Sequence, residues 1–477
     1  MSRYIPTIGL ETHAELSTNS KVFCTCSAEF GGTPNSRCCP VCSGLPGTLP
    51  VLNQKAVEYI IKAGYVTNCE ISRFTKWDRK NYFYPDLPKA YQISQMPRPV
   101  CLNGHVDINV KGEEKTIRIN RIHLEEDAGK LVHDDVNRFS LADYNRCGVP
   151  LIEIVTEPDF HSGDEVIAYL EKIMLLLQYA GICDCKMEQG SIRCDVNISL
   201  APEGSKELGT RTELKNLNSL KAIARAIEIE IERQEELLDN DEPVVQETRR
   251  FNEAAGETVA MRSKEDAHDY RYFPDPDIPP IIFTEEELDE IKNSIPELPE
   301  QRIKRLVEEY GIKQADADLI VGDKKICDFF DEACTAYNNP KAIANYINVE
   351  LNRRINLGEV DMDNRKFSGS EFAHLVEFMQ TDKISQANAK TVLREMIENG
   401  GEPKDIADKM DLWIKEDNDL LTKTIDEIIA NNPKPVEQYK SGDQKVFGFF
   451  MGQANKALKG AASPKAIQEY LRKKLGE

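Results

Sequence analysis

Carboxylates and one histidine recur within stretches that are typical of β-strands. Glu11 and His13 alternate with apolar residues in 8–15, so a strand there would place both side chains on one face. Glu153 lies inside the apolar run Leu-Ile-Glu-Ile-Val (151–155), where a carboxylate is costly unless it is paired or bound to a metal ion. Another apolar stretch ends in three acidic residues, which are Glu125, Glu126 and Asp127.

Oxygen ligands with a single imidazole suit a hard cation such as Mg²⁺, which also binds the phosphates of ATP. Each of these residues by itself is more often a salt-bridge partner. Glu153 is the exception, because its apolar neighbours leave it little access to water. A magnesium site is therefore the prediction, and a set of ordinary ion pairs is the alternative.

Four cysteines form a second cluster, Cys24-Thr-Cys26 followed by Cys39-Pro-Val-Cys42. Cys-Pro-x-Cys makes the tight turn of a zinc knuckle, and four thiolates give a closed tetrahedral site. A closed site leaves no position for a substrate, so we expect structural Zn²⁺ and not a catalytic centre. Cys38 could replace Cys39 as the third ligand, although the spacing favours Cys39. Four reduced cysteines in a loop are the alternative.

The segment 78–95 (Asp-Arg-Lys-Asn-Tyr-Phe-Tyr-Pro-Asp-Leu-Pro-Lys-Ala-Tyr-Gln-Ile-Ser-Gln) follows neither a helical nor a strand period. Its two prolines prevent a long helix, and its four aromatic residues argue against disorder. An ordered, irregular segment rich in Tyr, Lys and Asp is typical of a loop that binds a polar ligand. A structural loop held by aromatic packing fits the composition equally well.

A polar ridge is expected where Arg211, Glu213 and Lys215 alternate along a strand. Asp195 and Asn197 likewise share one face of the strand 192–198. The ridge could hold a phosphate or a polar substrate, and an edge strand protected by charge is the alternative.

The elements that must position these residues are strands and helices in mixed order up to about residue 295. Apolar patterning predicts strands at 8–15, 117–124, 151–155 and 192–198. Ser162, with Glu165 three residues later, and Ser219 each mark the start of a helix. Long irregular segments separate these elements, so we expect an α+β domain with mixed sheets over residues 1–295.

The remainder of the chain is predicted to be helical. Pro296-Glu-Leu-Pro299 marks a boundary, and Asn399-Gly-Gly-Glu-Pro403 marks a second one. This gives an all-α domain at 296–402 and a small all-α tail domain at 403–477. From Asn431 to Glu477 the tail has nine Lys/Arg against four Asp/Glu, a local charge of +5. Such a basic patch suits phosphate contacts, and a solvated helix face is the alternative.

Composition narrows the class of protein. The net charge of −21 argues against non-specific binding of nucleic acid by the whole surface. No apolar run approaches the roughly 18 residues that span a bilayer, and the N-terminus lacks a signal-peptide core. We therefore expect a cytoplasmic protein without membrane contact, whose 13 cysteines are reduced. The glycine-rich motifs of common nucleotide-binding folds and the Gly-x-Ser-x-Gly motif of hydrolases are absent.

The motifs, taken in order, resemble those of the GatB family, the B subunits of the tRNA-dependent amidotransferases. The resemblance extends over essentially the whole chain. It rests on the stretches 8–16, 44–53, 78–95, 124–130, 143–155, 214–219 and 432–442 together with both cysteine pairs.

The resemblance implies an ATP-dependent carbon–nitrogen ligase of protein biosynthesis, which converts Glu-tRNA(Gln) to Gln-tRNA(Gln) or Asp-tRNA(Asn) to Asn-tRNA(Asn). In this family ATP phosphorylates the side-chain carboxylate, and ammonia then displaces the phosphate. The ammonia comes from a partner amidase with glutamine or asparagine as donor, and a small third protein completes the heterotrimer. Phosphoryl transfer concentrates negative charge, so Mg²⁺ and cationic side chains are expected at the site.

The matching motifs also imply the residues of the site. The implied magnesium ligands are Glu11, His13, Glu125, Glu126, Asp127 and Glu153. Lys80 and Lys89 are implied to contact phosphate or carboxylate groups. The implied catalytic residues are these two lysines together with Glu11, His13, Glu125 and Glu153. The rest of the pocket is expected to consist of Tyr82, Tyr84, Asn145, Arg146 and Lys215. Some family members lack the cysteine pairs, which keeps Zn²⁺ out of catalysis.

Two other classes of protein remain as alternatives. One is a non-catalytic, zinc-containing scaffold that only binds tRNA, against which the apolar surroundings of Glu153 argue. The other is a zinc-dependent hydrolase, against which a zinc site with four Cys ligands argues. Under the favoured hypothesis the helical domain and the basic tail hold the tRNA through its phosphates and shape. The sequence leaves open whether Glu-tRNA, Asp-tRNA or both are the substrates.

Overall fold

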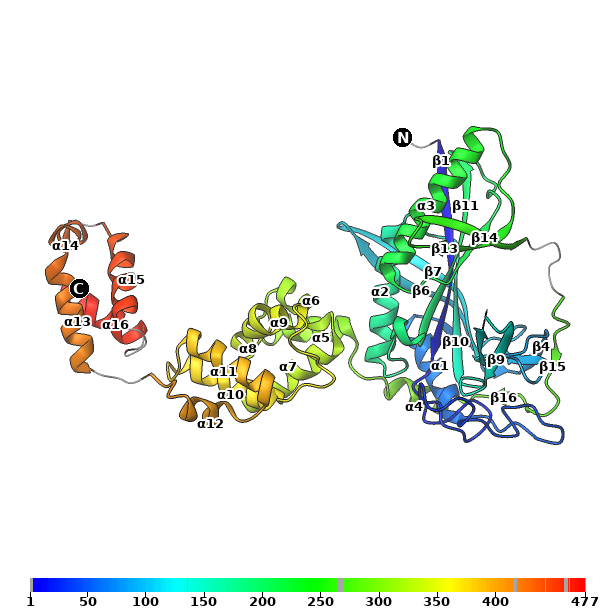
Figure 1. Cartoon of the computed structure of the whole chain (residues 1–477), viewed down its shortest axis with the longest axis horizontal. Coiled ribbons are helices and arrows are strands. Elements are labelled where there is room, and N and C mark those ends of the chain that lie inside the picture. The colour runs from blue at the N-terminus through cyan, green and yellow to red at the C-terminus, as the bar shows by residue number, and fades with distance from the viewer. Residues whose placement is uncertain are drawn as a thin grey trace. The chain divides into compact units, whose positions relative to one another are not determined.

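The computed structural model describes residues 3–134, 136–263, 269–414, 418–441, 443–458, 462 and 464–476. Contacts within the chain divide it into two compact units, Met1–Pro299 and Glu300–Glu477. The first unit combines sheets and helices and the second is helical (Figure 1). The predicted fold class, an α+β N-terminal part followed by helical parts, is therefore confirmed. None of the helices in the described ranges combines the length and the hydropathy that a bilayer-spanning helix needs.

A nine-stranded sheet forms the centre of the first unit. Its neighbouring strands are antiparallel except for β12 and β13, which are parallel. Their order is β14 (Glu257–Ser263), β13 (Glu247–Asn252), β12 (Thr212–Lys215), β11 (Ile192–Pro202), β1 (Tyr4–Glu15), β10 (Pro150–Thr156), β7 (Glu113–Glu126), β6 (Cys101–Val110) and β2 (Glu70–Ile71). The four strands predicted from apolar patterning are β1, β10, β11 and part of β7.

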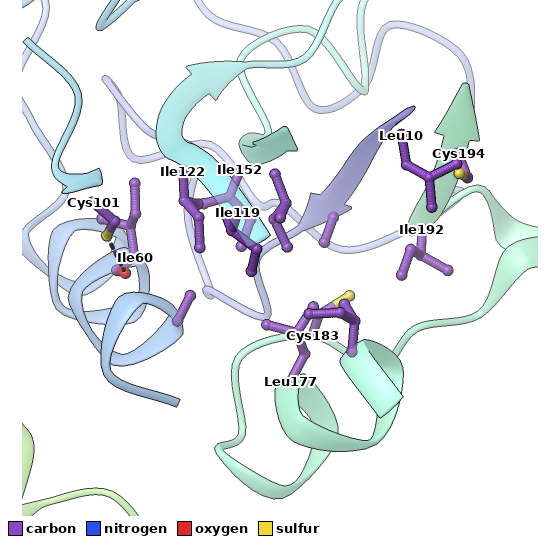
Figure 2. Packing of buried hydrophobic residues seen from close by; sticks show 14 of the residues in the cluster. Leu10, Ile60, Cys101, Ile119, Ile122, Ile152, Leu177, Cys183, Ile192 and Cys194 are labelled. Carbon is purple, nitrogen blue, oxygen red and sulfur yellow. Dashed lines mark hydrogen bonds between the residues drawn. The ribbon is translucent and has the colours of Figure 1, made fainter. Parts of the chain in front are cut away.

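Three helices pack against one face of this sheet: α1 (Gln54–Val66), α2 (Gly163–Tyr179) and α3 (Leu220–Asp239) (Figure 1). The side chains of Ser162 and Ser219 cap α2 and α3, as the sequence predicts. The core between the layers is aliphatic and includes Ile122 and Ile152 of the sheet and Leu177 of α2 (Figure 2). The Cys101 thiol lies in the same core and donates a hydrogen bond to the Ile60 carbonyl oxygen at 3.4 Å (Figure 2).

Smaller elements complete the first unit. A three-stranded sheet joins β4 (Asp78–Asn81), β5 (Tyr91–Ser94) and β15 (Phe273–Pro274). Two further pairs of strands are β3 (Phe74–Thr75) with β16 (Ile281–Ile282), and β8 (Lys130–Asp134) with β9 (Phe139–Asp143). One further helix, α4 (Glu285–Asn293), contacts α1.

The second unit is built from helices alone within the described residues. The first group is α5 (Pro299–Glu308), α6 (Gln314–Val321), α7 (Lys324–Ala336), α8 (Pro340–Tyr346), a π-helical turn (Ile347–Leu351), α9 (Asn352–Asn356), α10 (Gly369–Gln380), α11 (Gln386–Asn399) and α12 (Pro403–Lys409). A separate apolar core holds the last four, α13 (Asn418–Asn431), α14 (Pro433–Lys440), α15 (Val446–Leu458) and α16 (Pro464–Leu475).

The predicted boundaries at 295/296 and 402/403 stay predictions. Helix α12 packs against α10 and α11, so residues 403–409 belong structurally with the helices before them. Of the basic residues in the tail, Lys459 lies outside the described residues.

Candidate active site

The central strands of the large sheet carry polar residues on one face. His13 of β1 lies opposite Glu153 of β10, and Glu11 lies opposite Asp195 of β11. Glu153 in turn lies opposite His123 of β7. Directly opposed residues of antiparallel strands share a face, so these side chains gather together while their sequence neighbours enter the core. They line a cavity of about 690 Å³.

Three residues at the centre of this cavity could hold a metal ion. His13, Glu125 and Glu153 each offer a ligand atom, and these atoms lie within 4.8 Å of one another. His13 Nε2 is 3.4 Å from Glu153 Oε2, while His123 Nε2 is 3.0 Å from Glu125 Oε1 and 3.6 Å from Glu153 Oε2. The three candidate ligands come from three neighbouring strands, which fixes their spacing.

Hydrogen bonds hold the Glu125 carboxylate in place. Gln92 donates from Nε2 to Oε2 at 3.0 Å, and Ser94 donates from Oγ to Oε1 at 2.9 Å. Burial raises the pKa of Glu125, but the hydrogen bond and charge of His123 and the charge of Lys80 outweigh burial, so its pKa is lowered.

Neighbouring groups shift the pKa values of Glu153 and His13 in opposite directions. Burial opposes the charge of Glu153, yet His123, His13 and Lys80 lower its pKa. Burial also lowers the pKa of His13, but the carboxylates of Glu153, Glu125 and Asp195 raise it overall. Two buried carboxylates and an imidazole are a donor set that fits Mg²⁺.

A second acidic group lies next to the first. Glu11, Asp195 and Glu213 place carboxylate oxygens within 4.8 Å of one another. Lys215 Nζ contacts Asp195 Oδ2 at 2.5 Å and Glu213 Oε1 at 3.1 Å, so a protein cation already compensates this group. Burial lowers the pKa of Lys215, but these two carboxylates raise it overall. Glu11 therefore belongs to a different group from His13, although both line the cavity.

The segment 78–95 forms another part of the cavity wall. It forms β4, a turn and β5, and it contributes Lys80, Tyr82 and Gln92 to the lining. The Lys80 ammonium lies over the rings of Tyr270 and Tyr82, at 5.0 Å and 5.9 Å from their centroids. Burial lowers the pKa of Lys80, but Glu125 and the other anionic groups of the cavity raise it overall. Lys80 is therefore a half-buried cation near the carboxylates of the cavity.

Lys89 and Glu126 lie outside this cavity. Lys89 forms an ion pair with Glu126, and both line a separate cavity of about 230 Å³ beside Cys24 and Cys42. The Glu126 carboxylate also accepts a hydrogen bond from the backbone N–H of Ile93 at 2.9 Å. The structure thus places Glu126 away from the His13 group.

Asp127 lines the large cavity but is held by arginines. Its Oδ2 atom is 2.8 Å from Arg193 and 3.5 Å from Arg146. Burial raises the pKa of Asp127, but both guanidinium groups lower it overall. Arg146 also donates to the carbonyl oxygens of Ala128 and Gly129 at 3.0 Å and 2.8 Å.

Three of the predicted pocket residues are absent from the cavity lining: Arg146, Asn145 and Tyr84. Asn145 joins loops of the cysteine-rich region, accepting from the Arg37 N–H at 2.8 Å and donating to the Thr33 carbonyl oxygen at 2.7 Å. Tyr84 is exposed beside Tyr82, with ring centroids 6.2 Å apart. Asn145 therefore holds two loops together, whereas Tyr84 is exposed to solvent beside a residue of the cavity lining.

The four cysteines of the predicted zinc site come together. The sulfur atoms of Cys24, Cys26, Cys39 and Cys42 lie within 4.8 Å of one another. Cys38 donates instead to the Asn35 carbonyl oxygen at 3.2 Å and is not in this set. Four thiols at this spacing are the donor set of structural Zn²⁺. Hydrogen bonding from Cys24 is the largest cause that lowers the pKa of Cys42, to about 4.

Sequence reasoning missed several residues of the cavity. His123 and Arg121 escape it because the pattern Ile117-Arg-Ile-Asn-Arg-Ile-His-Leu124 is not a simple alternation. A bulge in β7 interrupts the alternation. Ile119 and Arg121 pair with Thr156 and Val155, which are consecutive residues of β10, so Asn120 has no opposing residue in β10. After the bulge Arg121, His123 and Glu125 share the cavity face. Counting back by two from Glu125 would have found them.

Two tyrosines of the lining, Tyr270 and Tyr272, were also missed. They come almost 200 residues after Lys80 and reach it through the pairing of β15 with β4. No local pattern in the sequence could indicate this long-range neighbourhood.

Two family models match most of the chain. A family model described as the GatB/GatE catalytic domain matches residues 6–289, and a second, described as the GatB domain, matches residues 328–475. The chain belongs to the GatB family. All residues that line the large cavity fall inside the first GatB match.

Curated GatB relatives are similar over their full length. The B subunit of the aspartyl/glutamyl-tRNA(Asn/Gln) amidotransferase of Ruminiclostridium cellulolyticum is 54% identical over 475 residues, covering 100% of this chain and 98% of the relative. The B subunit of the same name from Caldicellulosiruptor saccharolyticus is 52% identical and covers 99% of this chain and 99% of the relative. That from Carboxydothermus hydrogenoformans is 49% identical and covers 100% of this chain and 100% of the relative. The predicted GatB resemblance is thereby confirmed.

Proposed function

We propose that this chain is the B subunit of a tRNA-dependent amidotransferase and that it makes the amide on the tRNA. ATP transfers its γ-phosphoryl group to the side-chain carboxylate of Glu-tRNA(Gln) or Asp-tRNA(Asn), which gives ADP and an acyl phosphate. Ammonia then attacks the acyl carbon, and inorganic phosphate leaves. The first step is needed because a carboxylate does not react directly with ammonia in water.

The observation that carries this proposal is the composition of the cavity in the GatB/GatE catalytic domain. The candidate metal ligands His13, Glu125 and Glu153 converge there, and Lys80 and Lys215 flank them. A phosphoryl-transfer site needs a divalent cation and fixed cationic side chains around the transferred group. A non-catalytic scaffold would have no use for buried ionised carboxylates.

Each group of residues has a part in the mechanism. His13, Glu125 and Glu153 would hold Mg²⁺, which supplies charge neutralisation for the phosphates. Gln92 and Ser94 keep Glu125 oriented through their hydrogen bonds. Lys80 supplies a fixed positive charge from another part of the cavity wall, where phosphoryl oxygens gain negative charge.

Lys215 has a more local part. It neutralises Asp195 and Glu213, so this side of the cavity can admit an anionic substrate. Asn197 donates a hydrogen bond from Nδ2 to Glu11 Oε1 at 3.1 Å, which holds the Glu11 carboxylate beside Asp195 and Glu213. We assign these residues to substrate positioning.

The zinc site is structural in this proposal. Cys24, Cys26, Cys39 and Cys42 would hold Zn²⁺ with no open position. The closed site would cross-link two parts of the loop region that precedes α1.

Other chains complete the enzyme. A partner amidase supplies ammonia from glutamine, and a small third protein completes the heterotrimer. The helices of the second unit bind the tRNA body through phosphates and shape, with the basic residues of α16 among the contacts. We place the reaction in the cytoplasm, where charged tRNA is used.

Trapping the acyl phosphate tests this function. The assembled enzyme is mixed with Mg²⁺, ATP and Glu-tRNA(Gln), and hydroxylamine replaces ammonia so that the acyl phosphate becomes a hydroxamate. We expect ADP and the side-chain γ-hydroxamate in equal amounts. A reaction without ATP corrects for the α-hydroxamate that hydroxylamine forms by attacking the aminoacyl ester. Glu153→Gln should lower both by about 100-fold, since a lost metal contact of about 3 kcal/mol corresponds to that factor.

Glu157→Gln is the matched control, because Glu157 lies four residues further along, just past the end of the same strand, and bonds Asn120 outside the cavity. It should leave both products within about twofold of the unchanged enzyme. Equal hydroxamate from Glu153→Gln and the unchanged enzyme would refute the assignment of this cavity.

A further inference from the structure

Aromatic rings form a continuous row along the edge of the candidate active site. The rings of Tyr272 and Tyr270 have centroids 6.0 Å apart, and Tyr270 and Tyr82 are 6.1 Å apart. The row continues from Tyr82 to Tyr84 at 6.2 Å. The first three rings line the large cavity, and Tyr84 lies beyond it.

The outer end of the row is open to solvent. Tyr84 is 53% exposed and its neighbour Phe83 is 81% exposed. Two adjacent exposed aromatic side chains at the end of a row of rings offer a surface that a partner can cover. The row therefore connects a charged cavity with an exposed aromatic pair.

The loop that carries the pair is already ordered. Tyr144 donates from its hydroxyl to the Pro85 carbonyl oxygen at 2.9 Å, and the Gly129 N–H donates to the Asp86 carbonyl oxygen at 2.9 Å. A Cβ atom at Gly129 would lie 3.1 Å from that same Asp86 oxygen, so the glycine allows this close approach. Leu87 anchors the loop in the interior. Such a loop loses little conformational entropy on binding.

We propose that Phe83 and Tyr84 are the stacking platform for the unpaired 3′-terminal nucleotides of the charged tRNA. The inference rests on the proposed function. The reacting carboxylate is joined to the terminal ribose through the amino acid, so the last nucleotide must lie at the edge of the cavity. Aromatic side chains stack on unpaired bases whatever their sequence.

The shape of the row favours the end of a polymer over a mononucleotide. A single adenine, such as that of ATP, needs only one or two rings within the cavity. The row extends past the cavity to residues that are exposed, as the following nucleotides of a chain would require. Lys80 under Tyr270 and Tyr82 adds a positive charge at the inner end of the same row.

The test compares the assembled enzyme with its Phe83→Ala/Tyr84→Ala form. We expect the KM for Glu-tRNA(Gln) to rise about tenfold, which is about 1.4 kcal/mol, while the KM for ATP stays within about twofold. Tyr84→Phe keeps the ring, so combined with the native Phe83 it should restore the KM for Glu-tRNA(Gln) that Tyr84→Ala raises. Phe30→Ala is the matched control, because Phe30 is also exposed, at 66%, and is absent from the cavity lining.

A spectroscopic measurement separates stacking from a structural effect. A tRNA(Gln) whose terminal adenine is replaced by 2-aminopurine should lose fluorescence on binding the unchanged enzyme and keep it with the double variant. Removing the unpaired 3′ nucleotides should weaken binding to the unchanged enzyme about tenfold and leave binding to the double variant unaltered.

The outcomes are distinguishable. If the unchanged enzyme turns over and binds tRNA, but the double variant quenches the fluorescence equally, the platform is refuted and the proposed function stands. A rise in the KM for ATP alone would assign the rings to the adenine of ATP and overturn the inference. If the unchanged enzyme neither binds tRNA nor forms product, the proposed function fails as well.

Discussion

Lys80 and Lys89 should fail in different ways when their charge is removed, although they lie in one segment of the sequence. Lys80 lies near the carboxylates of the large cavity, whereas Lys89 is paired with Glu126 in a neighbouring one. A unit charge about 5 or 6 Å from a developing negative charge contributes about 3 kcal/mol at an effective dielectric constant of about 20. Lys80→Met should therefore lower kcat by roughly 100-fold.

Lys89→Met removes one partner of a buried ion pair and leaves the other uncompensated. The cost of such a change is about 3 kcal/mol of folding stability. We therefore expect a lower urea midpoint for Lys89→Met and a smaller decrease for Lys80→Met, whose contacts with Glu125 and Glu153 are longer-range. The exposed Lys130 provides Lys130→Met as a control for both measurements.

The assay is steady-state formation of Gln-tRNA(Gln) with free ammonia as donor, so that the partner amidase does not limit the rate. For Lys80→Met the KM for Glu-tRNA(Gln) should stay within about twofold, because Lys80 acts on the reacting groups. A fall in kcat of less than about threefold would refute the electrostatic reasoning. A rise in KM equal to the fall in kcat would move Lys80 from chemistry to tRNA binding.

Two further predictions concern the metal site and the fold. The Cys39→Ser variant should lose the single bound Zn²⁺, and Cys38→Ser should keep it, as measured by the metal content of the purified protein in mass spectrometry. The reverse result would make Cys38 the third zinc ligand in place of Cys39. Burial raises the pKa of Glu230, but Arg233 and the other polar partners of this carboxylate lower its pKa overall. The ionised Glu230 therefore stabilises the folded protein above about pH 4.5, and this stabilisation is lost as the pH falls through the lowered pKa. Glu230→Gln should cost about 3 kcal/mol in urea unfolding at pH 7 and much less near pH 3, and a difference that does not change with pH would contradict this account.

The sequence could predict the strands whose alternation is regular. Period two predicts that Glu11 and His13 share a face, and β1 places both on the cavity side. The apolar strand around Glu153 predicts a buried position, and Glu153 is buried. The cysteine spacing also predicts a set of four sulfur atoms that the structure brings together.

The remainder of the site depends on pairing between distant segments. The sequence does not separate Lys80 from Lys89, because the turn between β4 and β5 decides which cavity each one enters. Glu126 follows Glu125 directly, and successive residues of a strand point to opposite faces. Glu126 therefore points towards Lys89 and away from Glu125. Three consecutive acidic residues do not indicate by themselves which of them faces the cavity.

The bulge in β7 has a consequence for the kinds of change that this strand can tolerate. It switches the phase of the strand, so Ile117 and Ile119 before it and Ile122 and Leu124 after it all enter the core. Asn120 is the extra residue that the bulge accommodates, so its deletion would leave these four apolar residues in one regular alternation, with Arg121, His123 and Glu125 still on the cavity face. Deleting a residue on either side of the bulge would instead turn one half of the strand over. The core would then receive charged groups where it now holds isoleucine, or the cavity would receive aliphatic groups in place of its metal ligand. The strand should therefore tolerate the loss of Asn120 better than the loss of a residue elsewhere in β7.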